Sequence, residues 1–187
     1  MSKGLLRPGD DLLAVGYAGL KGTSVLTSLF SDKLSGFFPD SFLNRIRAWD
    51  SEAPVDPERI ERILDSCSAW TEVSRGGILA SLWKISEDSG TGLEADACLI
   101  PIRQETVEIC EFFDLNPYRL LCRNVWIAGT AGSWRILRDI KKLGLPCAVI
   151  GTVTTGPARM LKGTAGWRYL KRPMPDELEH ESGNLSP

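Results

Sequence analysis

The chain has 187 residues and a formal net charge of −2, with 25% charged and 43% hydrophobic residues. That length suits one domain with a sizeable core, and the near-neutral charge argues against a nucleic-acid-binding surface. The sequence lacks both the apolar run of ~20 residues that a membrane span requires and the apolar core of a signal peptide. We therefore expect a soluble, cytoplasmic protein with neither nucleic-acid nor membrane partners.

The cysteines and the histidine restrict the possible chemistry. Five widely spaced cysteines without a CxxC pair fit neither a zinc site nor a disulfide framework, and they indicate reduced thiols. The only histidine, His180, lies in a polar tail, which excludes a histidine-based triad or metal cluster in the folded body. Catalysis would have to depend on carboxylates, lysines, hydroxyls, backbone amides or a bound metal–nucleotide.

The chain alternates predicted strands and helices. A strand over 12–17 is followed by a turn with Gly16, Gly19 and Gly22, and by a helix from about Thr23. The pattern then predicts a helix around 42–49, a helix opened by Asp56 and Pro57, an extended piece at 70–73, and the Gly76-Gly77 turn with a helix after it. Next come a strand at 91–97, a helix at 101–114 and a helical turn at 117–121. The last predicted elements are a strand at 124–129, a helix at 133–144, a strand at 146–154 and a hairpin around Gly163. This alternation indicates one layered α/β or α+β domain. The polar, acidic segment after Pro173 is expected to be loosely ordered.

The Gly76-Gly77 turn is the first candidate site. One interpretation is a turn that packs a strand closely against a helix. The other is a cradle of backbone amides that binds phosphate, assisted by Ser74 and Arg75. The sequence here is not a Walker loop, so the residues alone leave both interpretations open, with the packing turn favoured.

The first glycine turn is a weaker candidate. Gly19 and Gly22 could admit a phosphate, but with Gly16 their spacing is not GxGxxG, and a tight turn is again favoured. Near the second turn, Glu72 is a weak candidate for a magnesium ligand, because a single carboxylate without companions is more often a solvated group. We otherwise expect no metal site.

Four collinear segments resemble one known family. They are "RPGDDLLAVGYAGLKGTSVL", "EVSRGGILASLWKISEDSGTGLEAD", "IPIRQETVEICEFFDLNPYRLL" and "LGLPCAVIGTVTTGPARML". Together they resemble the C-terminal domain of the aminoimidazole ribonucleotide (AIR) synthase-related superfamily. This superfamily includes the hydrogenase-maturation carbamoyl dehydratase, selenophosphate synthetase and thiamine-monophosphate kinase. The match runs from about Leu6 to Glu179 and is nearest to the hydrogenase-maturation and unassigned branches.

The resemblance implies an α+β fold with three layers (α/β/α), in which a mixed sheet of partial ferredoxin-like topology is flanked by helices. It also implies a part in ATP-dependent phosphoryl transfer, with the turn Ser74-Arg75-Gly76-Gly77 facing the phosphates. Two departures weaken an intact ATP site. Glu72 and Ser74 replace the family's aspartate and threonine, and Cys122-Arg123-Asn124 replaces its serine–serine–glycine.

Three interpretations follow. In the first, residues 1–179 form the C-terminal domain of an ATP-dependent enzyme that lacks the N-terminal ATP/Mg domain. It would be inactive and without cofactor alone, but able to use Mg-ATP with a separate N-terminal-domain protein. In the second, the chain is a degenerate stand-alone domain that binds a ligand or a protein without catalysis. In the third, it is a fragment of a longer enzyme. We also expect a homo-oligomer that covers an exposed apolar patch, and a disordered tail at 180–187.

Overall fold

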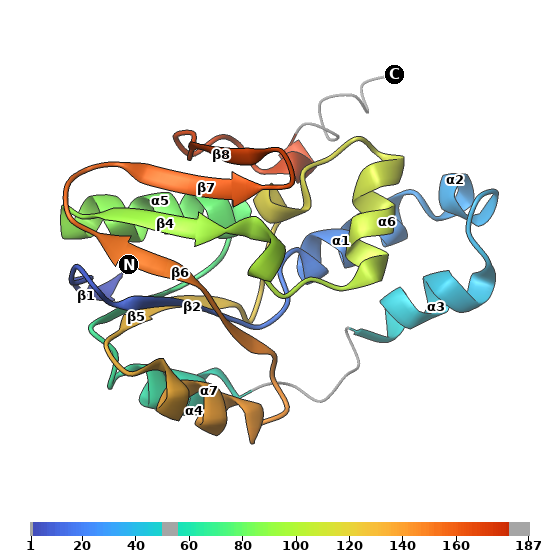
Figure 1. Ribbon diagram of the computed structural model, residues 1–187. Helices are drawn as coiled ribbons and strands as arrows, with labels where there is room; N and C mark the ends of the chain where they lie inside the picture. The colour runs from blue at the N-terminus through green and yellow to red at the C-terminus, as the bar shows by residue number, and fades with distance from the viewer. Residues whose placement is uncertain (1, 50–55, 180–187) are drawn as a thin grey trace.

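The computed structural model describes residues 2–49 and 56–179. Its centre is an eight-stranded mixed sheet in the order β1-β3-β5-β2-β6-β4-β7-β8 (Figure 1). Of the strand pairs in this sheet, β4 and β7 run parallel, and the others run antiparallel within the described residues. The strands are β1 (Lys3–Gly4), β2 (Asp11–Val15), β3 (Ala69–Glu72), β4 (Gly92–Asp96), β5 (Trp126–Thr130), β6 (Cys147–Thr154), β7 (Arg159–Gly163) and β8 (Gly166–Tyr169).

The longer helices lie where the sequence predicts helices, whereas the short helices at Ser31–Ser35 and Ala97–Leu99 were not predicted. The helices are α1 (Leu20–Leu29), α2 (Ser31–Ser35), α3 (Asp40–Ala48), α4 (Pro57–Leu64), α5 (Gly77–Ser89), α6 (Gln104–Phe112) and α7 (Ser133–Lys141), with short 3-10 helices η2 (Ala97–Leu99) and η3 (Pro117–Arg119). Asp56 caps α4 as predicted, since its carboxylate accepts from the N–H groups of Glu58 and Arg59. None of the described helices is long and apolar enough to cross a membrane.

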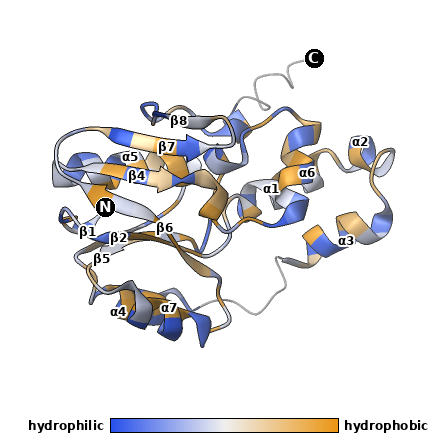
Figure 2. Cartoon of the chain, viewed as in Figure 1, coloured by the Kyte–Doolittle hydropathy of each residue, from blue (hydrophilic) through white to orange (hydrophobic). Residues whose placement is uncertain are grey.

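Helices cover both faces of the sheet, which confirms the expected α+β architecture. On one face, Ile78, Leu82 and Ile85 of α5 pack against strand residues such as Leu12 and Ile127. On the other face, α4 and α7 form a second core with alternate strand residues; its buried members include Leu13, Val15, Ile60, Leu64, Trp126, Ile136 and Ile140. Figure 2 shows the resulting pattern on α4 and α7, whose surfaces carry both hydrophobic and hydrophilic residues. The period-two alternation along β2 thus divides its side chains between two cores.

Beside the sheet, α1, α2, α3 and α6 form a separate helical group (Figure 1). Its core combines buried aliphatic residues with a cluster of aromatic rings; the residues are Leu26, Leu34, Leu43, Ile46, Ile109, Cys110, Leu120, Phe30, Phe38, Phe42, Phe112 and Phe113. Rings such as Phe38 and Phe42 stack with centroids 4.8 Å apart. The alternation of strands and helices in the sequence did not reveal this third core.

Two local predictions were wrong. Helix α1 begins at Leu20 rather than near Thr23, so Gly22 lies inside the helix and not in an open turn. The segment after Pro173 was expected to be loosely ordered, but Asp176 and Glu177 are only 4% and 6% exposed. Both carboxylates have partners in the body of the domain, which fixes this segment against α5 and η3. The predicted disordered tail at 180–187, including His180, lies outside the described residues.

Candidate functional site

The second glycine turn connects β3 to α5 in a left-handed backbone conformation. Gly76 has φ 76° and Gly77 has φ 65°, a region that residues with a Cβ rarely occupy. A Cβ on Gly77 would lie 2.4 Å from the Tyr118 carbonyl oxygen and 2.8 Å from the Arg119 backbone. Gly77 therefore allows α5 to begin in direct contact with η3, as the packing interpretation of the turn requires.

The amide of Gly76 holds an anion that belongs to the same chain. Its N–H donates to Oδ2 of Asp176 at 2.8 Å. The other oxygen, Oδ1, accepts from the N–H groups of Leu121 at 3.2 Å and Leu178 at 3.1 Å. Two amides from the body of the domain, those of Gly76 and Leu121, and one from the same segment, that of Leu178, thus bind the two oxygens of one buried carboxylate.

The next residue of the same segment forms a second buried anchor. Oε1 of Glu177 lies 2.6 Å from Nη2 of Arg119, and the exposed fractions of these side chains are 7% and 23%. The other terminal nitrogen, Nη1, contacts Sδ of Met174 at 3.6 Å. Nε of Arg119 is buried without a hydrogen-bond partner among the described residues. Arg119 therefore binds the C-terminal segment through Glu177 and Met174.

The other residues predicted around this turn have different roles. The Ser74 carbonyl accepts from the N–H groups of Gly77 and Cys122, both at 3.3 Å, so the Gly77 amide is already engaged. Arg75 is exposed and pairs with Glu179 at 3.3 Å. Glu72 is exposed at the end of β3. In the part of the chain that the structure describes, no group of three histidine, cysteine or carboxylate side chains could hold a metal.

The first glycine turn is closed by packing. A Cβ on Gly22 would lie 2.3 Å from Cγ of Leu120, and one on Gly19 would lie 3.0 Å from the Pro117 carbonyl oxygen. The Gly22 amide donates to the Leu121 carbonyl at 3.0 Å, and the Gly19 amide donates to Sγ of Cys122 at 3.2 Å. The structure places Gly19 and Gly22 against η3 and the segment after it, and the amides of both glycines are engaged by that segment.

Cys122 and Asn124 belong to the segment Cys122-Arg123-Asn124, which the sequence analysis expected to weaken an ATP site. Asn124 adopts φ 58°, the left-handed conformation that asparagine tolerates better than most residues. Burial raises the pKa of the Cys122 thiol to about 12, so this thiol stays protonated and inert near neutral pH. Asn124 thus stands in a backbone conformation that glycine adopts more readily.

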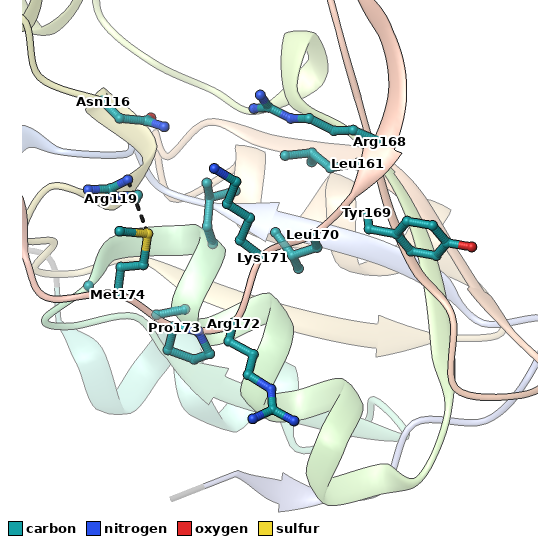
Figure 3. A pocket seen from close by; sticks show the side chains of 13 residues that line it. Asn116, Arg119, Leu161, Arg168, Tyr169, Leu170, Lys171, Arg172, Pro173 and Met174 are labelled. Atoms are coloured by element: carbon teal, nitrogen blue, oxygen red, sulfur yellow. Dashed lines mark hydrogen bonds between the residues drawn. The ribbon is translucent and has the colours of Figure 1, made fainter.

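An open pocket lies beside Gly76 (Figure 3). Its walls come from the start of α5, η3, β7, β8 and the segment that follows β8. They comprise Gly76, Leu79, Ala80, Asn116, Arg119, Leu161, Arg168, Tyr169, Leu170, Lys171, Arg172, Pro173 and Met174. Of these residues, Gly76 was predicted from the sequence, whereas the basic residues that line the pocket were not. One local feature of the sequence indicates that the segment after Pro173 is ordered. Asp176 stands before Glu177 and Leu178, where an aspartate is typical of a helix N-cap.

Comparisons with known proteins identify the domain. Residues 7–162 match the family "AIR synthase related protein, C-terminal domain". Carbamoyl dehydratase HypE from Rhodobacter capsulatus is 28% identical over 122 residues, which are 64% of this chain and 33% of that protein. HypE from Cupriavidus necator is 30% identical over 112 residues, or 59% of this chain and 29% of that protein.

Solved structures give the same fold. Escherichia coli HypE, a hydrogenase maturation protein, superposes with a TM-score of 0.69 and 22% identity over 92% of this chain and 52% of its own. Thiamine monophosphate kinase from Aquifex aeolicus gives a TM-score of 0.60 and 17% identity over 84% of this chain and 51% of its own. The chain therefore spans about a third of its curated relatives and about half of these structures. Since the family match covers most of its length, the chain belongs to the AIR synthase related proteins and comprises their C-terminal domain.

Proposed function

We propose that this chain works as the C-terminal half of an ATP-dependent enzyme related to AIR synthase, completed by an N-terminal-domain protein. The fold supports this proposal, because HypE has been solved in complex with ATP and a thiamine monophosphate kinase with AMPPCP and TMP. This chain covers 53% and 50% of those two structures. In the proposal, the isolated chain is inactive.

One observation carries the role of the glycine turn. The Gly76 amide already binds a carboxylate oxygen of Asp176 at 2.8 Å, and the Leu121 amide binds the other oxygen. The turn therefore fits an oxyanion, and we propose that it forms the phosphate cradle with Ser74, Arg75 and Gly77. A phosphate would have to replace the Asp176 carboxylate, because both glycine amides are engaged in the isolated chain.

The residues around the turn do not make a magnesium site. Glu72 stands alone at the end of β3, and the described residues offer no cluster of metal ligands. Magnesium requires several oxygen ligands in near-octahedral geometry. We therefore propose that any Mg-ATP would be held by residues of the partner domain, whereas this chain contributes the amides of the turn.

An exposed face of the sheet could receive that partner or a second copy of the chain. Trp167 and Tyr169 of β8 are 53% and 73% exposed. In the sheet they pair with Lys162 and Met160 of β7, so all four side chains lie on one face. Exposed aromatic side chains are typical of protein interfaces. HypE, whose fold is similar, has been solved in complex with HypF, which supports a protein partner for this fold. We propose that the isolated chain forms homo-oligomers through this face.

The experiment is a calorimetric titration of the purified chain with Mg-ATP, using wild type, Asp176→Ala and Asp139→Ala. Removing the Asp176 carboxylate frees the amides of Gly76 and Leu121, so Asp176→Ala should bind Mg-ATP at least about tenfold more tightly than wild type. Asp139→Ala removes the same charge from the exposed surface of α7 and should behave as wild type.

A double variant makes this test sharper. Gly76→Val in the Asp176→Ala background should cancel the gain, because the turn would lose its left-handed conformation. Equal affinity of Asp176→Ala and wild type would contradict the phosphate cradle. Light scattering should show a dimer or larger species for the wild type, and a monomer at all concentrations would contradict the homo-oligomer.

The hydrogen bond between the Gly76 amide and the Asp176 carboxylate also favours a second candidate function. Because the turn is closed by its own carboxylate, the chain could also act as a stand-alone binding domain without catalysis. In that case Mg-ATP would not bind even to Asp176→Ala, and the exposed Trp167–Tyr169 face would remain the functional surface.

A further inference from the structure

The pocket beside Gly76 combines an apolar floor with a strongly basic rim. Leu79 and Ala80 of α5, Leu161 of β7 and Leu170 provide apolar walls. Arg119, Arg168, Lys171 and Arg172 also line it, and no carboxylate does so among the described residues. A concave apolar surface that is lined by cationic side chains focuses a positive potential into the cavity. Such a pocket favours an organic anion over a neutral molecule.

The basic residues differ in how free they are to bind a ligand. Arg119 is held by Glu177 at 2.6 Å. Arg168 and Lys171 form no salt bridge with any carboxylate in the described part of the chain. Figure 3 shows both side chains extending toward the side of the pocket that carries Asn116, whereas Tyr169 and Arg172 point away. Arg168 and Lys171 are thus the cations that a ligand would meet first.

Asn116 supplies a neutral donor on the opposite wall. Its Oδ1 accepts from the Tyr118 N–H at 3.0 Å, which caps η3 and fixes the orientation of the amide. With the oxygen engaged, the side-chain NH2 group is the part of Asn116 left to donate. The pocket therefore presents a guanidinium, an ammonium and an amide NH2 above an apolar floor. Two full positive charges without a paired acid match a dianion better than a monoanion.

We propose that this pocket binds a small phosphomonoester, with Arg168 and Lys171 on the phosphate and the organic group against Leu79, Leu161 and Leu170. The inference goes beyond the ATP-related role of the glycine turn, because its cations come from β8 and the segment after it. It also leaves Asp176 in place on the Gly76 amide. A ligand could therefore occupy the pocket while the turn remains closed.

The test uses phenyl phosphate as the probe for the full chain, with inorganic phosphate and benzoate as comparisons. Calorimetry at low ionic strength should show saturable binding of phenyl phosphate, weaker binding of inorganic phosphate and weakest binding of benzoate. Arg168→Ala and Lys171→Ala should each weaken phenyl phosphate binding by about tenfold, the loss expected when a charge-assisted contact is removed. Lys84→Ala is the matched control, because Lys84 is an exposed lysine of α5 that does not line the pocket.

The substitutions lie on exposed side chains, so circular dichroism melting should confirm that every variant folds like wild type. Absence of saturable phenyl phosphate binding would overturn the proposal. So would an equal loss of affinity in Lys84→Ala, which would indicate general charge attraction, or unchanged affinity in Arg168→Ala and Lys171→Ala. Benzoate binding as tightly as phenyl phosphate would overturn the choice of a phosphomonoester.

Discussion

Both glycine turns of this chain border the same short segment, 117–122, but each is closed in a different way. At the first turn, Gly19 and Gly22 bring α1 against Pro117 and Leu120, and their amides bond to Cys122 and Leu121. At the second turn, Gly77 brings α5 against Tyr118, but the Gly76 amide bonds to a carboxylate from far along the sequence. The first turn is closed by neutral packing and the second by an anion.

This difference separates a structural glycine from a glycine with binding capacity. Packing explains Gly22 completely, because a Cβ there would overlap the Leu120 side chain. Packing explains Gly77 and also restricts Gly76, where a Cβ would overlap Cβ of Ala80 at 2.9 Å. Packing does not explain why the Gly76 amide binds an anion. A turn in a protein of unknown role should therefore be judged by what its amides bind, not by its glycine count.

The largest effect should come from breaking the first turn. Gly22→Val would place a branched side chain into Leu120 within a buried contact, where overpacking costs about 3 kcal/mol of stability. Urea unfolding should show a much lower midpoint for Gly22→Val than for wild type. Gly163→Val is the control, because nothing lies within 4 Å of a Cβ at Gly163. Equal midpoints for the two variants would show that the first turn does not depend on close packing.

The stability of the second turn should depend on the Asp176 carboxylate that its Gly76 amide binds. Asp176→Ala would leave the amides of Gly76, Leu121 and Leu178 without their acceptor, at a cost of roughly 2 kcal/mol of unfolding free energy. Hydrogen exchange should become faster at Gly76 in this variant, while the Gly22 amide, which bonds to Leu121, should change little. Faster exchange at both amides would mean that the two turns open as one unit.

The thiol at the first turn should give stability a pH dependence. Burial raises the pKa of Cys122 from about 9 to about 12, so the folded state favours the neutral thiol. Its contribution is fully present below pH 9 and is lost as the pH rises toward 12, and the loss by pH 10 is about 1 kcal/mol. The free energy of unfolding should fall less between pH 8 and pH 10 in Cys122→Ala than in wild type, as urea titrations would show. Parallel profiles would argue that the thiol is not buried.

The smallest effect concerns the bend at residues 123–124, which leads from the shared segment into β5. Asn124 has φ 58°, and glycine adopts this conformation without strain. Asn124→Gly should therefore raise the unfolding free energy slightly, by about 0.5 kcal/mol, after the added entropy of the unfolded glycine is subtracted. A higher thermal unfolding midpoint for Asn124→Gly than for wild type would confirm this prediction. Destabilisation would indicate that the Asn124 side chain has a role that its backbone conformation does not explain.

Local patterns predicted much of the fold. The start of α4 at Asp56 and Pro57 follows from capping, the apolar stripe of α5 from helical periodicity, and the hairpin between β7 and β8 from turn chemistry. The start of α1 was misplaced because Gly22 was taken as a turn residue. In the structure Gly22 lies within α1, where the missing side chain leaves room for Leu120 to pack. A glycine that serves packing between distant segments has the same local signature as one that serves a turn.

The candidate site was predictable only in part. Gly76 and Gly77 were visible as a pair, but the residues that give the turn its electrostatic character come from elsewhere in the chain. Asp176 reaches Gly76 across the domain, and Arg168 and Lys171 reach the pocket through the β7–β8 hairpin. No periodicity or motif relates these positions, because their proximity is created by the order of strands in the sheet.

The position of β2 at the centre of that sheet has a kinetic consequence. Its neighbours, β5 and β6, follow it by about 110 to 140 residues, so the first long strand cannot find either partner until most of the chain exists. Contacts of such long range slow folding, because the intervening loop must be closed before any pairing energy is gained. During that interval Leu12 to Val15 form an apolar strand with two unpaired edges. This strand is therefore the segment for which we expect a chaperone to compete during synthesis.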